Sequence, residues 1–399
     1  MTKIVGEDSK IRKLYDIRSS RSFKEQLSEC PSLQGKYINT VMSDDPAVMI
    51  FSSGSTGRPK GVLLSACNIL NAGLSNAKDL EITDKDSICL ILPLFHIFGL
   101  VAGLFANSMS NSRIVLPKNA HSETILECVE KKKCTLLHAV PTLLLAMVNN
   151  KNFSSEKVAS LRCTIISGAS ATEAQLLMFR EKMPNTEFFS AYGLSELAPA
   201  TITTMHDTVE HLTKTVGKAA ENVGLRICDR ETGRILGVGE SGEVLLRGYN
   251  LMTAYCKMDL KDQSFDPDGW LRTGDMGYLD EEDYLHLTGR FKDLIIRGGE
   301  NIIPSEIAAV LTEFPAVKDA VVVAAASEFY GEEVAACLLL RDEVPYDQEE
   351  LLNYVRSRLA KFKVPSYIFI YEDFPHLPNG KIDMVSLRKE VKTKVQNGI

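Results

Sequence analysis

The segment IFSSGSTGRPKGV, residues 50–62, combines residue types that bind a polyphosphate. Gly54 and Gly57 allow a tight turn whose backbone N–H groups point inward, and Lys60 supplies a mobile cation. A Walker loop has glycines five apart followed by Lys-Ser or Lys-Thr, whereas here the glycines are three apart and Gly61 follows the lysine. The segment therefore predicts a phosphate loop of another class. Its further donors are the hydroxyls of Ser52, Ser53, Ser55 and Thr56.

The alternative for this segment is a flexible Ser/Gly linker. The apolar sequence AVMIF directly before it predicts a strand, and a helix-like stretch follows it. A glycine-rich turn between a strand and a helix is the usual setting of a phosphate loop, so the functional interpretation is favoured.

Composition and charge set the class of protein. With 399 residues and 45% hydrophobic content, the chain is long enough for two or three domains with their own cores. The net charge of -7 is spread without a basic stripe or polybasic patch, which makes nucleic acid an unexpected partner. The N-terminal sequence MTKIVGEDSKIRKLYD is too charged for a signal peptide, so we expect a cytoplasmic protein.

The nine cysteines form no CxxC pair and show no metal-ligand spacing. Their number is odd, which does not suit a complete set of disulfides. We therefore expect buried thiols in a reducing compartment.

The stretch from Ile88 to Ala106 carries no formal charge over nearly the length of a membrane span. Two interpretations compete, a span and a buried strand that runs into a loop and a core helix. Pro93 falls where the strand-like part ends, His96 is ionisable, and Gly99 and Gly103 lower helix propensity. These residues favour the second interpretation, and we expect no membrane span.

The wider chain predicts an α/β fold. Strand-like and helical segments alternate from residue 87 to about 192, which indicates layered α/β sheets. From about 215 to 290 shorter strands with Gly and Asp turns predict a small distorted barrel or antiparallel sheet. From about 303 the order helix, two strands, helix, strand, helix predicts a compact α+β domain.

Six segments together resemble, in order, the motifs of the adenylate-forming superfamily, and most closely the AMP-forming acyl-CoA synthetases. The similarity covers the chain from about residue 45 onward. It implies a large adenylation domain at 1–291 and a small, mobile C-terminal domain at 292–399. The six segments are SSGSTGRPKG (52–61), PLFH (93–96), YGLSE (192–196), LRTGD (271–275), GRFKDLIIRGGENI (289–302) and PNGKID (378–383).

The resemblance implies ATP and Mg²⁺ as ligands. Lys60 and its loop would hold the β- and γ-phosphates, Glu196 the magnesium ion, and Asp275 and Arg290 the ribose. Ser195 departs from the more usual threonine, but its hydroxyl can still donate to the α-phosphate or acyl oxygen. The full set implied to contact ATP is Ser52, Ser53, Gly54, Ser55, Thr56, Gly57, Lys60, Gly168, Ala169, Ser170, Ser190, Ala191, Tyr192, Gly193, Asp275 and Arg290.

Two of these assignments have ordinary structural alternatives. Segments 167–171 and 190–192, which would border the adenine, also suit tight turns after strands. Glu196 could be a solvated loop acid. For the adenine we expect Tyr192 to stack on the ring.

The C-terminal motifs imply further roles. Lys381 resembles the lysine that contacts the acyl oxygen and the α-phosphate during adenylation; alone, it would read as a surface lysine. Lys292 resembles the hinge between two domain arrangements. Gly298 and Gly299 would permit close approach of a pantetheine arm, or simply form a turn at a domain boundary.

His96 lies in an apolar run, where a histidine is often a buried core residue. Within PLFH it resembles the aromatic gate of the acyl pocket in acyl-CoA synthetases. Amino-acid-activating relatives carry an acid in this region for the substrate amine, and none is seen here. The resemblance thus implies an apolar carboxylic acid as substrate, without indicating its chain length.

The phosphate loop begins about fifty residues from Met1, where relatives carry an additional subdomain. Four explanations stay open: a split gene, a truncated sequence, a natural short form, or a homodimer or partner chain that covers the apolar surface exposed by the missing layer. The leading hypothesis is a ligase that converts a carboxylic acid, ATP and CoA into a thioester through acyl-AMP. The alternatives are transfer to a carrier protein's phosphopantetheine, or a catalytically weak nucleotide- or acyl-binding protein.

Overall fold

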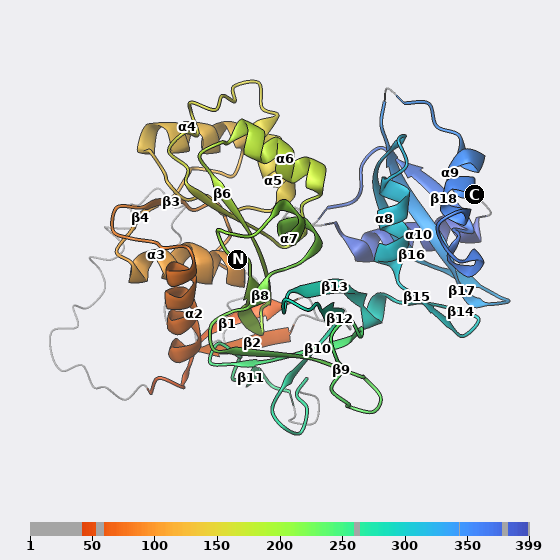
Figure 1. The fold of residues 1–399 in the computed structure, drawn as a ribbon, viewed down its shortest axis with the longest axis horizontal. Coiled ribbons are helices and arrows are strands. Elements are labelled where there is room, and N and C mark those ends of the chain that lie inside the picture. The colour runs from red at the N-terminus through yellow and green to blue at the C-terminus, as the bar shows by residue number, and fades with distance from the viewer. Residues whose placement is uncertain (1–41, 53–59, 259–263, 343, 377–381, 398–399) are drawn as a thin grey trace, which may run out of the picture. The chain divides into compact units, whose positions relative to one another are not determined.

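The computed structural model describes residues 42–52, 60–258, 264–342, 344–376 and 382–397 (Figure 1). Sheets and helices alternate in its first part, as the sequence predicts. Smaller antiparallel sheets follow, and an α+β unit forms the end of the chain.

A three-stranded sheet holds the two ends of the predicted phosphate loop. Strand β1 (Pro46–Ser52) pairs antiparallel with β2 (Lys60–Ser65), and Ser52 lies opposite Lys60. On the other side of β2 lies β11 (Ala254–Tyr255). Helix α2 (Ala66–Asp79) follows β2 directly and begins with a capping box at its N-terminus. The predicted strand before the loop is thereby confirmed.

The main sheet combines parallel and antiparallel pairs. Strands β3 (Ser87–Cys89) and β4 (Arg113–Val115) are parallel, and single bridges at residues 136–139 link β3 to β5. Strand β5 (Cys163–Ser167) runs parallel to β6 (Glu187–Leu194), so the carboxyl ends of both lie at one edge. The remaining elements of this part are α3 (Ala106–Met109), α4 (Ser122–Lys132), α5 (Pro141–Val148), α6 (Glu173–Lys182), β7 (Leu197–Ile202), α7 (Val209–Lys214) and β8 (Lys218–Ala219).

The uncharged stretch at 88–106 forms a strand and a buried helical segment. After β3 the chain turns at Pro93 and enters η1 (Gly99–Phe105), a π-helical segment that continues into α3. A Cβ atom at Gly99 would lie 2.4 Å from the Pro93 carbonyl oxygen, so this tight entry requires glycine. Among the helices of the described ranges, none has the length and apolar character needed to cross a bilayer.

The region predicted as a distorted barrel is an open antiparallel sheet in the described residues. Its order is β13 (Leu285–Arg290), β12 (Leu271–Leu279), β10 (Gly242–Gly248) and β9 (Val223–Cys228). The sequence analysis found the LRTGD motif but did not predict that it belongs to a nine-residue strand. Because β12 and β13 are adjacent, Asp275 lies directly opposite Arg290.

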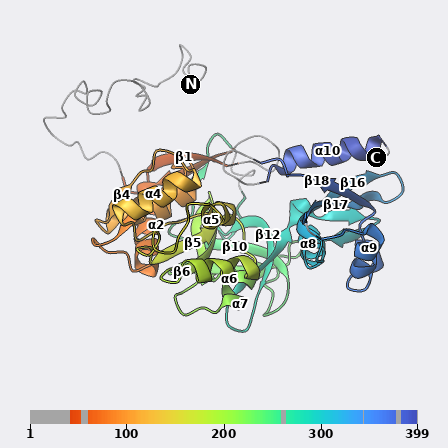
Figure 2. The same cartoon turned by 90° about the horizontal axis from the view of Figure 1, so that it is seen from above.

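The C-terminal part has a sheet between helices, as Figure 2 shows. Helices α8 and α9 bury their apolar side chains on one face of the sheet, and α10 packs on the other. The strand and helix order confirms the predicted α+β arrangement. Its elements are η3 (Phe291–Asp293), β14 (Ile295–Arg297), β15 (Glu300–Ile302), α8 (Pro304–Thr312), β16 (Val317–Ser327), β17 (Gly331–Leu340), α9 (Gln348–Arg356), η4 (Lys361–Lys363), β18 (Tyr367–Tyr371) and α10 (Met384–Gln396).

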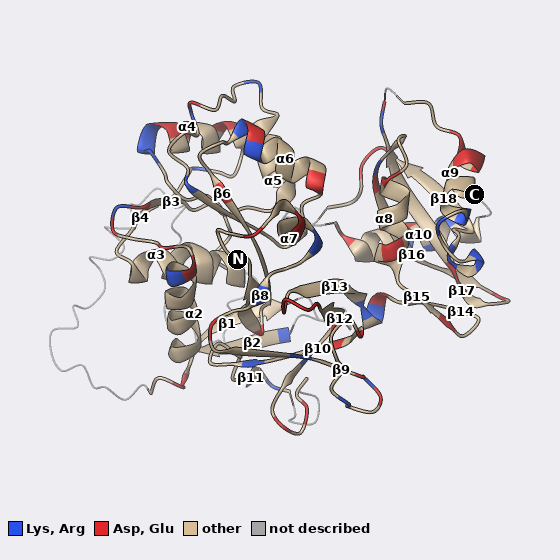
Figure 3. Cartoon of the chain, in the orientation of Figure 1, with Lys and Arg blue, Asp and Glu red and all other residues tan. Residues whose placement is uncertain are grey.

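Charged residues of both signs are interspersed over the described surface. Figure 3 shows Lys and Arg beside Asp and Glu on α4 and α6. Several of these form exposed ion pairs, such as Lys131 with Glu127. Exposed ion pairs contribute little to the free energy of unfolding, so most of the stability comes from the buried apolar clusters.

Candidate active site

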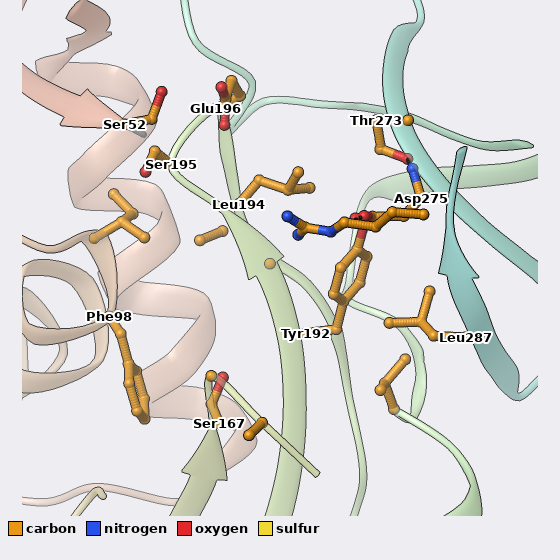
Figure 4. Close-up of a pocket in the computed structure, with 18 of the residues that line it drawn as sticks. Ser52, Phe98, Ser167, Tyr192, Leu194, Ser195, Glu196, Thr273, Asp275 and Leu287 are labelled. Carbon is orange, nitrogen blue, oxygen red and sulfur yellow. Dashed lines mark hydrogen bonds and ion pairs between the residues drawn. The ribbon is translucent and has the colours of Figure 1, made fainter. Parts of the chain in front are cut away.

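One large cavity brings together most of the residues that the sequence analysis selected. Its volume is about 1250 Å³, which exceeds the roughly 300–1000 Å³ of a pocket for one small ligand. The selected residues that line it are Ser52, Lys60, His96, Gly168, Ala169, Ser170, Ser190, Ala191, Tyr192, Gly193, Ser195, Glu196, Asp275, Arg290 and Lys292. Figure 4 shows three sides of this cavity, with Glu196, Asp275 and Phe98 on different ones.

Some of the selected residues cannot be placed there. Gly298 and Gly299 do not line the cavity. Six others lie outside the described residues, and their roles stay predictions; these are Ser53, Gly54, Ser55, Thr56, Gly57 and Lys381.

At the first side of the cavity Tyr255 connects two charged groups, Lys60 and Glu196. We call this side the phosphate end, and the side at Asp275 and Arg290 the ribose end, after the roles that the resemblance implies. Its hydroxyl donates to Oε1 of Glu196 at 2.7 Å, and the Lys60 ammonium lies 4.6 Å from the centre of its ring. This proximity follows from the pairing of β11 with β2, where Tyr255 lies opposite Val62. Burial and the Glu196 carboxylate raise the pKa of Tyr255, so its phenol stays protonated and donates.

Glu196 is positioned by a tight turn. Strands β6 and β7 are joined by Ser195 and Glu196 alone, with Leu194 paired to Leu197 across the turn. The backbone oxygen of Glu196 also accepts a hydrogen bond of 2.7 Å from Met252 N–H. A two-residue connection leaves the backbone little freedom, so the carboxylate is held at the cavity edge together with Ser52 and Ser195 (Figure 4).

At the second side, the ribose end, Asp275 is the shared acceptor of two groups. Tyr192 Oη donates to Asp275 Oδ2 at 2.6 Å, and Arg290 Nε lies 2.6 Å from Asp275 Oδ1. The Asp275 side chain is 4% exposed, whereas that of Arg290 is 50% exposed. Figure 4 shows Tyr192 pointing toward Asp275.

Burial and charge at the ribose end fix the protonation state of Tyr192. Desolvation raises the pKa of Tyr192 well above its ordinary value, and the Asp275 carboxylate raises it further. Tyr192 is therefore a neutral donor at any physiological pH. The backbone N–H of Asp275 donates to the Thr273 hydroxyl at 3.0 Å, which fixes the strand at this point.

Small residues at the carboxyl ends of β5 and β6 form one wall of the cavity. Ser167 Oγ donates to the Ala191 carbonyl at 2.8 Å, and Gly168 follows with a φ of 85°. At Gly193 an added Cβ would lie 3.0 Å from that of Ala198, so a larger residue would disturb the β6–β7 hairpin. The wall thus leaves room for a flat ring, as expected for a ligand at the edge of parallel strands.

The third side of the cavity is mainly apolar. It includes Phe98, Val101, Ala102 and Ile165. His96 precedes this group, and its Nδ1 accepts a hydrogen bond of 3.2 Å from the backbone N–H of Phe98. This bond orients the ring and assigns the proton of the neutral imidazole to Nε2.

The region predicted as a hinge is a short helical turn. Lys292 is exposed in the middle of η3. The next residue, Asp293, forms an ion pair with Arg388, with 2.6 Å between Oδ1 and Nη2. Gly298 and Gly299 form the two-residue turn between β14 and β15, with φ values of 59° and 91°. Positive φ at both positions is what such a hairpin turn requires, so the two glycines satisfy the geometry of the turn.

Tyr255 contacts both charged groups of the phosphate end and was not predicted from the sequence. It belongs to the short segment TAYCK, whose composition suggests no chemistry. Its role depends on strand pairing with residues almost two hundred positions earlier, and no local signal in one sequence indicates this.

Comparisons with known proteins find relatives over most of the chain. Residues 2–256 match the AMP-binding enzyme family, and residues 306–381 match the AMP-binding enzyme C-terminal domain. The chain is 35% identical over 355 residues to a putative acyl-CoA synthetase, YngI, of Bacillus subtilis, covering 88% of this chain and 65% of that protein. It is 37% identical over 363 residues to acyl-CoA ligase sidI of Aspergillus fumigatus, covering 87% and 61%.

Solved structures show the same similarity. ATP-bound MatB from Rhodopseudomonas palustris superimposes with a TM-score of 0.82 at 28% identity, covering 88% of this chain and 69% of that one. MenE, the o-succinylbenzoate CoA synthetase of Bacillus subtilis, in complex with ATP and magnesium, gives 0.75 at 32% identity, covering 88% and 70%. The chain thus spans less than two thirds of the length of the two curated relatives.

Proposed function

This chain belongs to the AMP-binding enzyme family, and on that premise we propose that it activates an apolar carboxylic acid with ATP. The products would be acyl-AMP and pyrophosphate, and the acyl group would then pass to the thiol of CoA. The observation that carries the proposal is the joining of a charged phosphate end, a ribose end and an apolar side in one cavity.

The described residues suit the parts of ATP. Asp275 can accept hydrogen bonds from the two ribose hydroxyls, and Arg290 can contact the ribose or a phosphate. Lys60 offers its ammonium group to the β- and γ-phosphates. The small residues at 167–169 and 190–193 leave space for adenine beside Tyr192.

Glu196 is the residue that would hold Mg²⁺. Its carboxylate is a hard oxygen ligand on the same side of the cavity as Lys60, which suits an ion that also binds phosphate oxygens. Bound Mg²⁺ neutralises phosphate charge and lowers the repulsion of an approaching carboxylate. Tyr255 holds the Glu196 side chain in position.

The chemical step is an attack of the substrate carboxylate oxygen on the α-phosphorus of ATP. The bond from the α-phosphorus to the bridging oxygen breaks, and pyrophosphate leaves with the electron pair. Two anions meet in this step, so donors and cations around the phosphates lower its barrier. We assign Ser195 to the α-phosphate or acyl oxygen and Lys381 to the same pair of oxygens in the transition state.

The substrate proposal rests on the apolar side of the cavity. Phe98, Val101, Ala102 and Ile165 suit an alkyl or aryl group, and His96 would act as the gate between this group and the reacting carboxylate. Competition between apolar acids and amino acids of similar size would test this. Preferred activation of amino acids would contradict it.

For the second step we propose CoA as the acceptor, with Lys292 as the hinge and the turn at Gly298 and Gly299 as the approach for pantetheine. A carrier protein's phosphopantetheine is the alternative acceptor, which the same residues would serve. Chromatography of products made with free CoA and with a panel of carrier proteins separates the two. If thioester forms only on a carrier protein, the acceptor of the acyl group is the carrier protein and not CoA.

We also propose that a second copy or a partner chain covers the surface of β1 and α2. Strand β1 is an edge of its sheet among the described strands, and apolar side chains lie exposed on both elements. Light scattering after size-exclusion chromatography measures the oligomeric state. An active monomer would contradict the need for a partner. The exposed residues are Met49, Phe51, Leu70 and Leu74.

The function itself is tested by following AMP and acyl-CoA by chromatography after mixing protein, ATP, Mg²⁺, CoA and a panel of carboxylic acids. Acid-dependent appearance of both products in equal amounts is expected. Release of ADP and phosphate in place of AMP and pyrophosphate would contradict the proposal.

A further inference from the structure

Three cysteines that are scattered along the sequence meet in the fold away from the cavity. They are Cys89 at the end of β3, Cys128 in α4, and Cys134 just after that helix. Their sulfur atoms all lie within 4.8 Å of one another. The spacing of the cysteines along the chain gave no indication of a metal site, because the three come together only through tertiary structure.

The backbone around the three thiols explains why they converge. Helix α4 ends at Lys132, and Lys133 adopts a left-handed conformation with a φ of 51°. The chain then folds back, so that Cys134 N–H donates to the Val129 carbonyl at 3.3 Å and the Cys134 thiol lies against the last turn of the helix. Cys89 is held beside this turn by a bond of 2.9 Å from its N–H to the Leu136 carbonyl.

The spacing of the sulfur atoms fits an ion after a small adjustment. Zinc–thiolate bonds of about 2.3 Å place sulfurs at tetrahedral corners about 3.8 Å apart. Separations of at most 4.8 Å therefore need each of the three sulfurs to move toward their common centre by no more than about 0.6 Å, which a change in side-chain torsion can supply.

Burial and charge around the cluster also suit a divalent cation. Cys89 and Cys134 are fully buried in an apolar core, and Cys128, which packs against the same core, is the one of the three with surface exposed to solvent. The Ser87 hydroxyl lies 4.0 Å from the Cys134 sulfur and accepts a bond of 3.0 Å from Arg113 Nε. Three thiolates and one divalent ion carry a single net negative charge, and the nearby guanidinium offsets it.

We propose that Cys89, Cys128 and Cys134 bind one thiophilic divalent ion of the zinc class, with water in the fourth position on the Cys128 side. The ion displaces the three thiol protons, which leave to solvent, and no electron is transferred. None of the three cysteines lines the cavity, so the site ties β3 to α4 as a structural clamp and does not depend on the proposed function.

Cobalt titration of the whole reduced and chelator-treated protein tests this inference. Co²⁺ in a tetrahedral thiolate site gives visible d–d bands and ultraviolet thiolate-to-metal charge transfer. We expect both to saturate at one equivalent and to disappear when one equivalent of Zn²⁺ is added. Absence of the bands, or saturation at a different stoichiometry, would overturn the proposal.

Two variants with similar exposure locate the site. Cys128→Ser and Cys67→Ser both replace a half-buried thiol on a helix, but Cys67 lies on α2 outside the cluster. Cys128→Ser should weaken Zn²⁺ binding by more than the ten- to a hundredfold that loss of an outer-sphere partner costs. Cys67→Ser should bind as the unchanged protein does; equal affinity in both variants would overturn the assignment.

Thermal unfolding provides a second measurement, which does not depend on enzymatic activity. An ion that binds only the folded protein raises the unfolding midpoint. We expect Zn²⁺ to raise the midpoint in the unchanged protein and in Cys67→Ser, and to raise it much less in Cys128→Ser, where binding is weaker. The same rise in Cys128→Ser would contradict binding by the three thiols.

Discussion

The ribose end and the phosphate end of the cavity are built differently. At the ribose end, Asp275 is buried, lies in register with Arg290 on the adjacent strand, and accepts from Tyr192 as well. At the phosphate end, Lys60 and Glu196 are joined only through Tyr255 among their described contacts, one by its ring and the other by its hydroxyl.

Because the two ends are built differently, we expect them to bind the two parts of a nucleotide in different ways. Under the proposed function, the acceptor for the ribose, Asp275, is fixed before ATP binds, so little ordering of the protein is required at this end. The phosphate end holds two opposite charges on either side of one aromatic residue. When ATP binds, we expect the Lys60 ammonium to leave the Tyr255 ring for phosphate oxygens and the Glu196 carboxylate to bind Mg²⁺. The side chains of this end would thus rearrange on binding.

The largest effect is expected at Lys381, which is assigned to the α-phosphate and the acyl oxygen between the groups that bind the ribose and those that bind the β- and γ-phosphates. Lys381→Ala should lower the rate of acyl-AMP formation by about a hundred- to a thousandfold, because one donor to the transition state is lost. Thioester formation from added acyl-AMP and CoA should remain nearly unchanged. Rapid-quench assays of the two half-reactions measure both rates. An equal loss in both half-reactions would contradict the assigned role.

The next effect tests the fixed character of the ribose end. Asp275→Asn keeps the shape but removes the charge that pairs with Arg290. We expect kcat/KM for ATP to fall by about a hundredfold, which corresponds to about 3 kcal/mol and to the loss of charged hydrogen bonds. A comparison of ATP with 2′-deoxy-ATP sharpens the test. The variant should discriminate less between them, and unchanged discrimination would place the ribose elsewhere.

A smaller loss is expected at the phosphate end. Glu196→Gln can still accept from Tyr255 but loses the charge for Mg²⁺. Because phosphates and water also hold the ion, we expect about a thirtyfold fall in the adenylation rate and a higher Mg²⁺ requirement. Initial rates over a range of Mg²⁺ concentrations show this. A variant with the original Mg²⁺ dependence would exclude Glu196 as the ligand.

Tyr255 separates the two contacts of the phosphate end. Tyr255→Phe removes only the hydroxyl that positions Glu196, whereas Tyr255→Leu also removes the ring beside Lys60. The first change should weaken apparent Mg²⁺ binding about tenfold, as loss of an outer-sphere partner does. The second should in addition raise KM for ATP. Identical kinetics for the two variants would show that the ring contact has no role.

The smallest catalytic effect is expected at a similar ion pair outside the cavity. Asp86 accepts two bonds of 2.8 Å from Arg162, and its side chain is 6% exposed. Burial opposes ionisation of Asp86, but hydrogen bonds led by that of Arg162 outweigh it and lower its pKa from 3.8 to about 2. Asp86→Asn should therefore destabilise the fold by about 2 kcal/mol while leaving kcat/KM for ATP within about twofold.

The pH dependence of this control has a definite sign. Because the folded-state pKa of Asp86 is depressed, its contribution is complete above about pH 4 and is lost as the pH falls toward 2. Unfolding midpoints of Asp86→Asn and the unchanged protein should differ at pH 7 and converge in acid. A constant difference, or an ATP defect as large as that of Asp275→Asn, would contradict the contrast between the two pairs.

The sequence predicted the elements that carry their own local signals. The alternation of apolar and polar segments indicated the order of strands and helices, and the six motifs indicated Glu196 and Asp275. It could not predict that Tyr192 donates to Asp275, 83 residues away, or that Tyr255 joins Lys60 to Glu196. Both contacts depend on which strands become neighbours, and the convergence of Cys89, Cys128 and Cys134 depends on it as well.

The most direct test of the central claim is isotope exchange between pyrophosphate and ATP with a panel of carboxylic acids and without any thiol. Adenylation in the cavity predicts exchange that requires both Mg²⁺ and an apolar acid, and that falls in Asp275→Asn but not in Asp86→Asn. Binding of ATP without acid-dependent exchange, for every acid in the panel, would contradict the claim and leave a nucleotide-binding protein.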